Sequence, residues 1–121
     1  MHSEVLLEHF RNPRNVGELP PPAITVEVSN PACGDILRLS ARIEADQVVQ
    51  AAFKTRGCTA SIAAGSALTD LIVGQSVTDL RRLKAGVVER AVGGLIPESR
   101  HAAVLCVDAV QALVREARKA T

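Results

Sequence analysis

The sequence contains almost no aromatic residues: two of its 121 residues are phenylalanine, and none is tryptophan or tyrosine. Since 47% of the residues are hydrophobic, a buried core must be built from valine, leucine, isoleucine and alanine. A chain of this length buries about two-thirds of the surface that its unfolded form exposes, so it needs neither a disulfide nor a metal merely to fold. We expect one domain over residues 1–121.

The chain also has no excess of one charge, with 14 basic and 13 acidic residues and no basic block. Phosphate-driven binding needs clustered lysine and arginine, and single-strand binding needs aromatic platforms as well, so nucleic acid is excluded as a partner. No apolar run approaches the roughly 20 residues of a membrane span, and the first ten residues carry too much charge for a signal peptide. We therefore expect a cytoplasmic protein with no membrane partner.

The three cysteines, Cys33, Cys58 and Cys106, form no C-x-x-C pair. Disulfides are rare in a reducing cytoplasm, and an odd number of thiols there favours metal or sulfur chemistry. There is also no arrangement of serine, histidine and aspartate that would support nucleophilic catalysis. Nucleophilic catalysis of this kind is therefore not expected.

The hydrophobic pattern first predicts a short helix at residues 3–10, capped by Ser3, with Val5, Leu6 and Phe10 on its apolar side. Prolines at 13 and 20–22 then impose a loop. Alternating residues predict strands at 23–30, 35–44 and 47–56. Because the turns between them are short, an antiparallel meander is favoured.

From residue 59 the pattern becomes helical, and a helix is predicted at 59–73 with Gly74 as its stop. Ser76 can cap a second helix at 77–83, and a last helix is predicted at 100–119. The fold class is therefore α+β, a small antiparallel sheet with helices packed on one face.

Four residues with metal-binding side chains, Cys33, Asp35, Cys58 and His101, all fall in a loop or where a predicted strand or helix begins or ends. Cys58 follows Gly57 at the start of a helix, where unpaired N–H groups favour the negative charge of a thiolate. The same field disfavours imidazolium at His101, so the ring stays neutral and able to bind a metal. Two thiolates, one imidazole and one carboxylate suit zinc, or a two-iron cluster with mixed ligands.

A purely structural role is the alternative for each of these residues. A lone cysteine is most often a small buried hydrophobic residue, and the Cys-Gly-Asp run at 33–35 can be an ordinary turn. An isolated histidine is commonly a hydrogen-bonded polar residue. Spacing alone does not decide between these alternatives and a metal site.

The motifs that carry more weight are NPRNVG at 12–17, ACGD at 32–35, FKTRGC at 53–58 and HAAVLC at 101–106. In this order they resemble the NifU/IscU-type scaffolds for iron–sulfur cluster assembly, along nearly the whole chain. The resemblance implies a three-stranded antiparallel sheet with helices, and a role in assembly instead of catalysis. It implies that a cysteine desulfurase delivers sulfur, that a labile [2Fe-2S] cluster forms from added iron, and that apo iron–sulfur proteins receive it.

By the same resemblance Cys33, Asp35, Cys58 and His101 are the cluster ligands, and Cys33 and Cys58 are candidate sulfur acceptors. Asp35 keeps the cluster exchangeable, because a carboxylate binds iron less tightly than a thiolate does. Related proteins hold Zn²⁺ in the same pocket, so zinc is a further candidate ion.

Two departures from the family pattern stand out. Members with a histidine at the position of His101 carry a third cysteine directly after it, where this chain has Ala102. Cys106 lies one helical turn beyond Ala102, about 6 Å along the axis, so it reaches the site only with rearrangement; packing in the core is favoured for it. In LIPES, at 95–99, only Leu95 and Pro97 match the segment that an Hsp70-type chaperone reads, so that partner is not expected.

These departures leave two alternatives to an iron–sulfur scaffold. One is a zinc-binding sulfur acceptor that stimulates a cysteine desulfurase. The other is a degenerate paralogue with a regulatory role, for which Ala102 is the only support.

Overall fold

The computed structural model describes residues 2–31 and 34–119. In chain order the elements are helix α1 (Glu4–Arg11), strands β1 (Ile24–Ser29), β2 (Ile36–Glu44) and β3 (Gln47–Arg56), helices α2 (Thr59–Ile72), α3 (Val77–Leu80) and α4 (Ala85–Ala91), the 3-10 turn η1 (Pro97–Ser99), and helix α5 (His101–Lys119). Within these residues, no helix has both the length and the apolar character that a membrane crossing requires.

The strands form a three-stranded antiparallel sheet in the order β1-β2-β3, which confirms the predicted meander. The β2–β3 hairpin turns through two residues, Ala45 and Asp46, whose φ angles are 51° and 66°. Two successive positive φ values are typical of the type I′ turn, whose twist matches that of the flanking strands. The tight turn sets the register beside it, where Glu44 pairs with Gln47, and a shift between Arg42 and Ile43 then moves the register by one residue, so that Ile36 pairs with Arg56.

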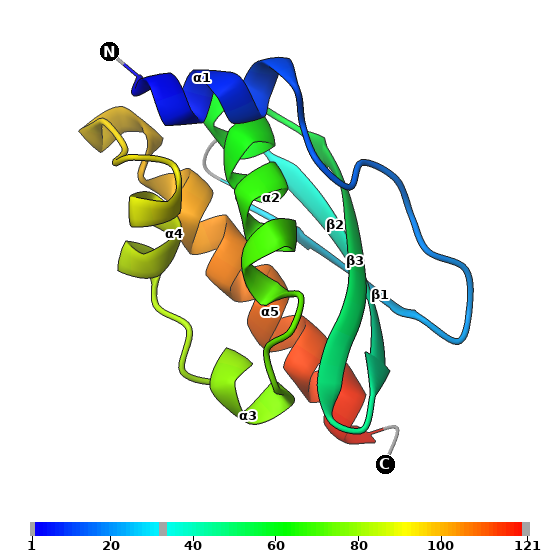
Figure 1. Cartoon of the computed structure of the whole chain (residues 1–121). Coiled ribbons are helices and arrows are strands. Elements are labelled where there is room, and N and C mark those ends of the chain that lie inside the picture. Colours follow the sequence, from blue (N-terminus) through cyan, green and yellow to red (C-terminus); the bar gives the residue numbers. More distant parts are fainter. Residues whose placement is uncertain (1, 32–33, 120–121) are drawn as a thin grey trace.

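Helices α2 and α5 lie across one face of the sheet, with α1 and α4 packed at the same end of the molecule and α3 at the other (Figure 1). The segment that joins α1 to β1 pairs with the free edge of β3, where the Phe53 N–H donates to the Asn15 carbonyl and the Gly17 N–H donates to the Phe53 carbonyl. The α+β architecture with helices on one face of the sheet is therefore as the sequence predicts.

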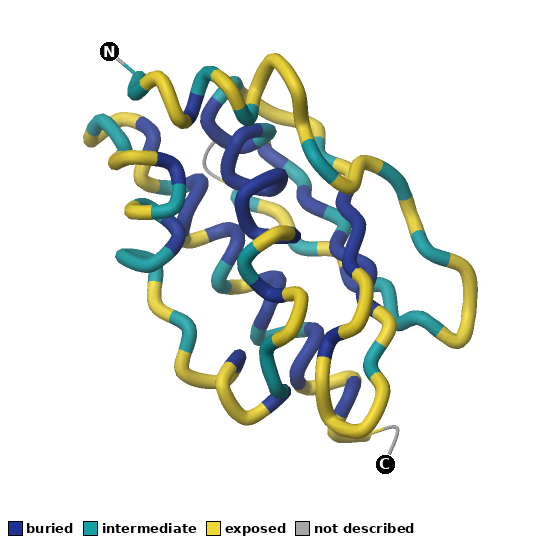
Figure 2. The backbone as a smooth tube through the Cα atoms, in the orientation of Figure 1, coloured by how far each residue is buried: buried dark blue, intermediate teal, exposed yellow. Residues whose placement is uncertain are grey.

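The core lies between the sheet and helices α2 and α5, and Phe53 is the one aromatic side chain among its buried residues in the described chain. Most of α2 is buried, as Figure 2 shows. Small residues on α2 let the helix approach the sheet closely: a Cβ added to Gly65 would lie 2.6 Å from the Phe53 ring. A chain nearly free of aromatic residues thus fills its core with aliphatic side chains at short interlayer distance.

For helix α1, the predicted cap is confirmed, whereas the predicted apolar side is correct only in part. The Ser3 cap is confirmed, because the Leu6 N–H donates to Ser3 Oγ over 2.9 Å. The predicted apolar side is wrong for Val5 and Phe10, which are 49% and 38% exposed, whereas Leu6 is fully buried. A helix of two turns presents only a narrow stripe to its neighbours, which here consists of Leu6 and the partly buried Leu7.

The connection between α2 and α5 also departs from prediction. The Ser76 cap is confirmed by a 3.0 Å hydrogen bond from the Asp79 N–H, but α3 ends at Leu80 instead of residue 83. Helix α4 was not predicted, because Gly86 and the β-branched Val87 and Val88 are weak helix formers. Burial of Val88 in the core stabilises this helix through tertiary contacts instead.

Candidate metal centre

Three of the four predicted ligand residues come together at one end of the molecule. Asp35 immediately precedes β2, Cys58 is the N-cap residue of α2, and His101 is the first residue of α5. One donor atom from each lies within 4.8 Å of the other two. Cys33, the fourth predicted ligand, lies outside the described residues.

The individual distances are close to those within one coordination sphere. Cys58 Sγ lies 3.7 Å from Asp35 Oδ2 and 3.7 Å from His101 Nε2, and Nε2 lies 3.3 Å from Oδ2. Around a tetrahedral zinc ion with bonds of about 2.3 Å to sulfur and about 2.0–2.1 Å to nitrogen or oxygen, the sulfur lies about 3.6 Å from each lighter ligand, and those two lie about 3.4 Å apart. The three donors therefore fit one metal ion and leave a fourth position open.

The tautomer of His101 is set by the turn that precedes α5. Its Nδ1 lies 3.1 Å from the Glu98 carbonyl oxygen, which can only accept a hydrogen bond, so Nδ1 carries the proton and donates it. The lone pair is then on Nε2, the nitrogen that faces Cys58 and Asp35. A backbone carbonyl commonly orients a metal-binding histidine in this way.

Asp35 is the most buried of the three residues, with 5% of its surface exposed. Its Oδ2 accepts a 2.5 Å hydrogen bond from the hydroxyl of Ser61, which also lies 3.4 Å from Cys58 Sγ. Ser61 is not among the residues that the sequence predicts for the site. Its position three residues after Cys58, on the same face of a predicted helix, was the signal that could have found it.

Cys58 is exposed, whereas Cys106 is 1% exposed and belongs to the hydrophobic core. Burial raises the pKa of the Cys106 thiol to about 12, so this thiol stays protonated at neutral pH. Ala102, at the position of the family's third cysteine, is also buried. Among the described residues the metal centre thus contains one thiol, that of Cys58.

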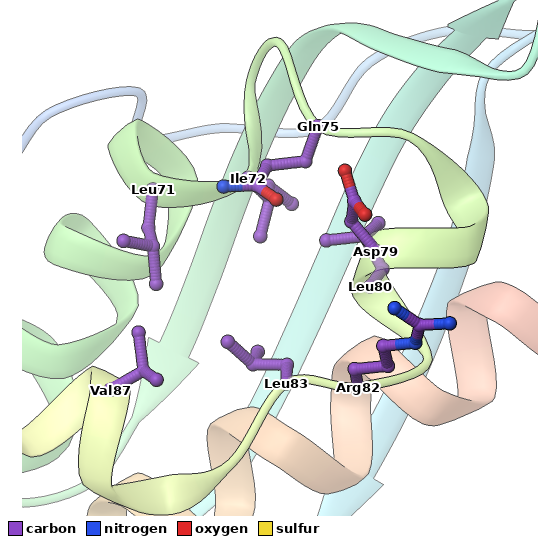
Figure 3. Close-up of a pocket in the computed structure, with 8 residues that line it drawn as sticks. All are labelled: Leu71, Ile72, Gln75, Asp79, Leu80, Arg82, Leu83 and Val87. Carbon is purple, nitrogen blue, oxygen red and sulfur yellow. The ribbon is translucent and has the colours of Figure 1, made fainter.

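A separate pocket of about 230 Å³ lies between α2, α3 and α4, as Figure 3 shows. Leu71, Leu83 and Val87 point into it, and Asp79 and Arg82 lie at its rim. It is at the C-terminal end of α2, roughly 20 Å from Cys58 given the rise of 1.5 Å per residue over this helix. It contains none of the predicted site residues.

Fold and site together define a small α+β protein with a cysteine, an aspartate and a histidine converging at one end of its sheet. The family model described as the NifU-like N terminal domain matches residues 1–120. The chain belongs to this family.

Relatives with curated names point in the same direction. The chain is 39% identical over 107 residues to the bifunctional protein NifU/MnmA of Rubrobacter xylanophilus, a match that covers 87% of this chain and 22% of that much longer protein. It is 34% identical over 119 residues to the iron–sulfur cluster assembly scaffold protein IscU of Azotobacter vinelandii, covering 95% of this chain and 92% of that one. A relative named as a scaffold agrees with the prediction that this chain is not an enzyme.

Among solved structures, a crystal structure from Fervidobacterium islandicum, described as a candidate iron–sulfur cluster assembly scaffold for the SUF system, superposes with a TM-score of 0.76. The match covers 93% of this chain and 96% of the other, at 17% sequence identity. At that identity the likeness concerns the fold, and it agrees with the NifU/IscU-like architecture expected from the sequence.

Proposed function

We propose that this protein is a scaffold on which [2Fe-2S] clusters are assembled from iron and from sulfur delivered by a cysteine desulfurase, before transfer to apo iron–sulfur proteins. Membership of the NifU-like family supports this role, as does the name of the Azotobacter relative. The observation that carries the proposal is the spacing of Cys58 Sγ, Asp35 Oδ2 and His101 Nε2, which suits three ligands of one metal ion.

In this proposal Cys33, Asp35, Cys58 and His101 bind the cluster. The three described donors hold the first iron, and Cys33, two residues before Asp35, supplies the remaining protein ligand. A two-iron cluster needs its four ligands divided between two metal ions, so one of the three described donors must move to the second iron as it forms. Cys58 and His101 stand at a helix end and are at least partly exposed, which favours a movement of one of these two.

The ligand set also suits a cluster that has to leave. A carboxylate is a harder and weaker ligand for iron than a thiolate, and an imidazole in place of a thiolate raises the reduction potential of a cluster. With Ala102 in place of a cysteine, this chain offers two thiolates at most. We expect its cluster to be held more weakly than in relatives with three.

Cys58 is the described residue best suited to accept sulfur. Its thiol is exposed and lies at the N-terminus of α2. The thiolate attacks the outer sulfur of the desulfurase persulfide, an S–S bond forms on Cys58, and the desulfurase cysteine leaves as its thiolate. The step is an exchange that needs no external oxidant or reductant.

Anaerobic reconstitution with ferrous iron, cysteine, a cysteine desulfurase and a thiol reductant, which reduces the persulfide sulfur to sulfide, tests the proposal. We expect a visible-absorbing cluster in the wild type, its loss in Cys33→Ala and Cys58→Ala, and its retention in Cys106→Ala, the control that removes a thiol from the core. A colourless, iron-free wild-type product would overturn the assignment.

A zinc-dependent sulfur acceptor is a second candidate, because the observed spacing fits a single tetrahedral zinc ion as well. Mass spectrometry after incubation with desulfurase and cysteine separates the two functions. One retained zinc with a persulfide on Cys58, and no cluster, would favour the zinc-binding acceptor. A chain that binds neither metal would instead match the degenerate paralogue that Ala102 suggested.

A further inference from the structure

We propose that Ser61 is a positioning residue for this metal centre, whose hydroxyl holds the carboxylate of Asp35 in the orientation that a metal ion requires. The inference rests on the proposed function, since it concerns the same site. It adds a residue that is not itself a ligand and acts through one.

Ser61 lies in the first turn of α2, three residues after Cys58, so both side chains project from the same side of the helix. It is 3% exposed, whereas serine is usually a surface residue. Its Oγ lies 2.5 Å from Asp35 Oδ2 and 3.4 Å from Cys58 Sγ. A buried hydroxyl thus stands between two of the proposed ligands.

The direction of these hydrogen bonds follows from the protons available. A carboxylate can only accept, so the single hydroxyl proton of Ser61 is donated to Asp35, and the Cys58 thiol has Asp35 Oδ2 and the Ser61 oxygen as its acceptors. When a metal displaces the thiol proton, the bond from Ser61 to Asp35 remains. A hydrogen bond to a carboxylate is charge-assisted and stronger than one between neutral groups.

The oxygen that Ser61 holds is the one that faces the metal position. Oδ2 is the Asp35 atom that lies 3.3 Å from His101 Nε2 and 3.7 Å from Cys58 Sγ. A carboxylate oxygen has two lone pairs, so Ser61 can occupy one and leave the other for the ion. Gly57 also packs against this carboxyl group, so closely that an added Cβ would lie 2.7 Å from Asp35 Cγ. The carboxyl group is therefore confined by a hydroxyl and by a bare backbone.

Without the hydroxyl, Asp35 loses the group that selects this rotamer, and its Oδ2 is free to turn from the metal position. Hydrogen-bonding partners of metal ligands are commonly worth about 10–100-fold in metal affinity. We expect a loss of that size on removing the Ser61 hydroxyl, and we expect it to depend on Asp35.

The test is titration of the full chain with Co²⁺ and Zn²⁺ against a competing chelator, with the visible bands of bound Co²⁺ as a spectroscopic readout. Ser61→Val and Ser61→Thr are matched in shape and differ in the hydroxyl, so their comparison holds even where Ser61→Ala folds poorly. We expect about 10–100-fold weaker binding and altered Co²⁺ bands in Ser61→Val, with recovery in Ser61→Thr.

Ser66→Ala is the matched control, because Ser66 is another buried serine of α2 whose hydroxyl bonds to His9 and to the Arg14 N–H, away from the metal centre. It should weaken folding and leave metal affinity unchanged. In an Asp35→Ala background, Ser61→Val should have no further effect on affinity, because Ser61 acts through Asp35.

Equal affinities and spectra for Ser61→Val and Ser61→Thr would overturn the role of Ser61, as would an undiminished loss in the Asp35→Ala background. In either case a wild type that still binds metal and builds a cluster leaves the scaffold function standing. A wild type that binds neither Co²⁺ nor Zn²⁺ and builds no cluster would overturn both proposals.

Discussion

The backbone of Gly57 lies directly against the carboxyl group of Asp35. A Cβ built on Gly57 would be 2.7 Å from Asp35 Cγ and 2.9 Å from each carboxylate oxygen. Such separations are well below van der Waals contact. Any residue larger than glycine at position 57 would therefore displace Asp35 from its observed position. The glycine before Cys58 is thus needed for space beside a proposed ligand.

We predict that Gly57→Ala displaces Asp35 and weakens Co²⁺ or Zn²⁺ binding by at least tenfold, as loss of a ligand's support typically does. Chelator competition measures the affinity, and thermal unfolding monitors the fold. Gly86→Ala is the control, because a Cβ there meets only Arg90 Nη1, at 3.5 Å. Unchanged affinity in Gly57→Ala would show that Asp35 does not ligate from this position.

Cys58 and Cys106 should differ sharply in reactivity toward thiol reagents. Cys58 is exposed, whereas burial raises the pKa of the Cys106 thiol to about 12 and shields its sulfur from solvent. Because the thiolate is the reactive form, we predict rapid alkylation of Cys58 in the native chain. Cys106 should be modified only after denaturation.

Peptide mass mapping after a timed iodoacetamide pulse distinguishes the two sites. Pre-incubation with Zn²⁺ should protect Cys58 and leave Cys106 unaffected. Alkylation of native Cys106 at a rate similar to that of Cys58 would contradict its place in the core.

The features that could be predicted well are those that depend on residues close together in the sequence. Alternation in 35–44 and 47–56, with a short turn between them, predicted adjacent antiparallel strands, and Ser3 and Ser76 predicted helix starts through their capping chemistry. The positions of Asp35, Cys58 and His101 at element ends were visible in the same way. Each of these inferences needs only a few neighbouring residues.

Features that depend on distant partners could not be predicted. Helix α4 forms although Gly86 and Val87 disfavour it, because burial of Val88 supplies the stability. Nothing local shows that the Ser61 hydroxyl meets Asp35, since 26 residues separate them in the chain. That three element ends meet at one point was implied by resemblance to a family, whereas spacing alone left it open.

His9 makes folding stability depend on pH. Its Nδ1 lies 2.8 Å from Ser66 Oγ and 3.5 Å from Arg14 Nη1. Because a guanidinium can only donate, Nδ1 accepts, and the Ser66 hydroxyl donates to a neutral His9 ring. Burial, followed by the positive charge of Arg14, lowers the pKa of His9 below its ordinary value of 6.5; Asp70 and Glu8 offset part of this shift.

Because the pKa of His9 is lower in the folded chain, the unfolded chain binds the proton more readily as the pH falls below about 6.5. The stability that neutral His9 contributes is complete above that pH and is lost as the pH falls through the lowered pKa. We predict that urea unfolding at pH 5–6.5 shows a steeper loss of stability in wild type than in His9→Gln, which cannot titrate there. Above pH 7 the two should show the same dependence, and parallel curves throughout would refute the role of His9.

The hairpin between β2 and β3 contains a residue that local backbone geometry disfavours. Ala45 has a φ of 51°, and the left-handed region costs an L-residue about 1–2 kcal/mol, which glycine avoids at an entropic cost of about 0.5–1 kcal/mol. Its side chain is exposed, so its removal forfeits little packing. We predict that Ala45→Gly raises the free energy of unfolding by about 0.5–1 kcal/mol, as measured in urea. Ala112→Gly is the control, because it makes the same chemical change inside α5, where it should lower the free energy of unfolding by about 1 kcal/mol. If Ala45→Gly also lowered the free energy of unfolding, Ala45 would not have a positive φ in this turn.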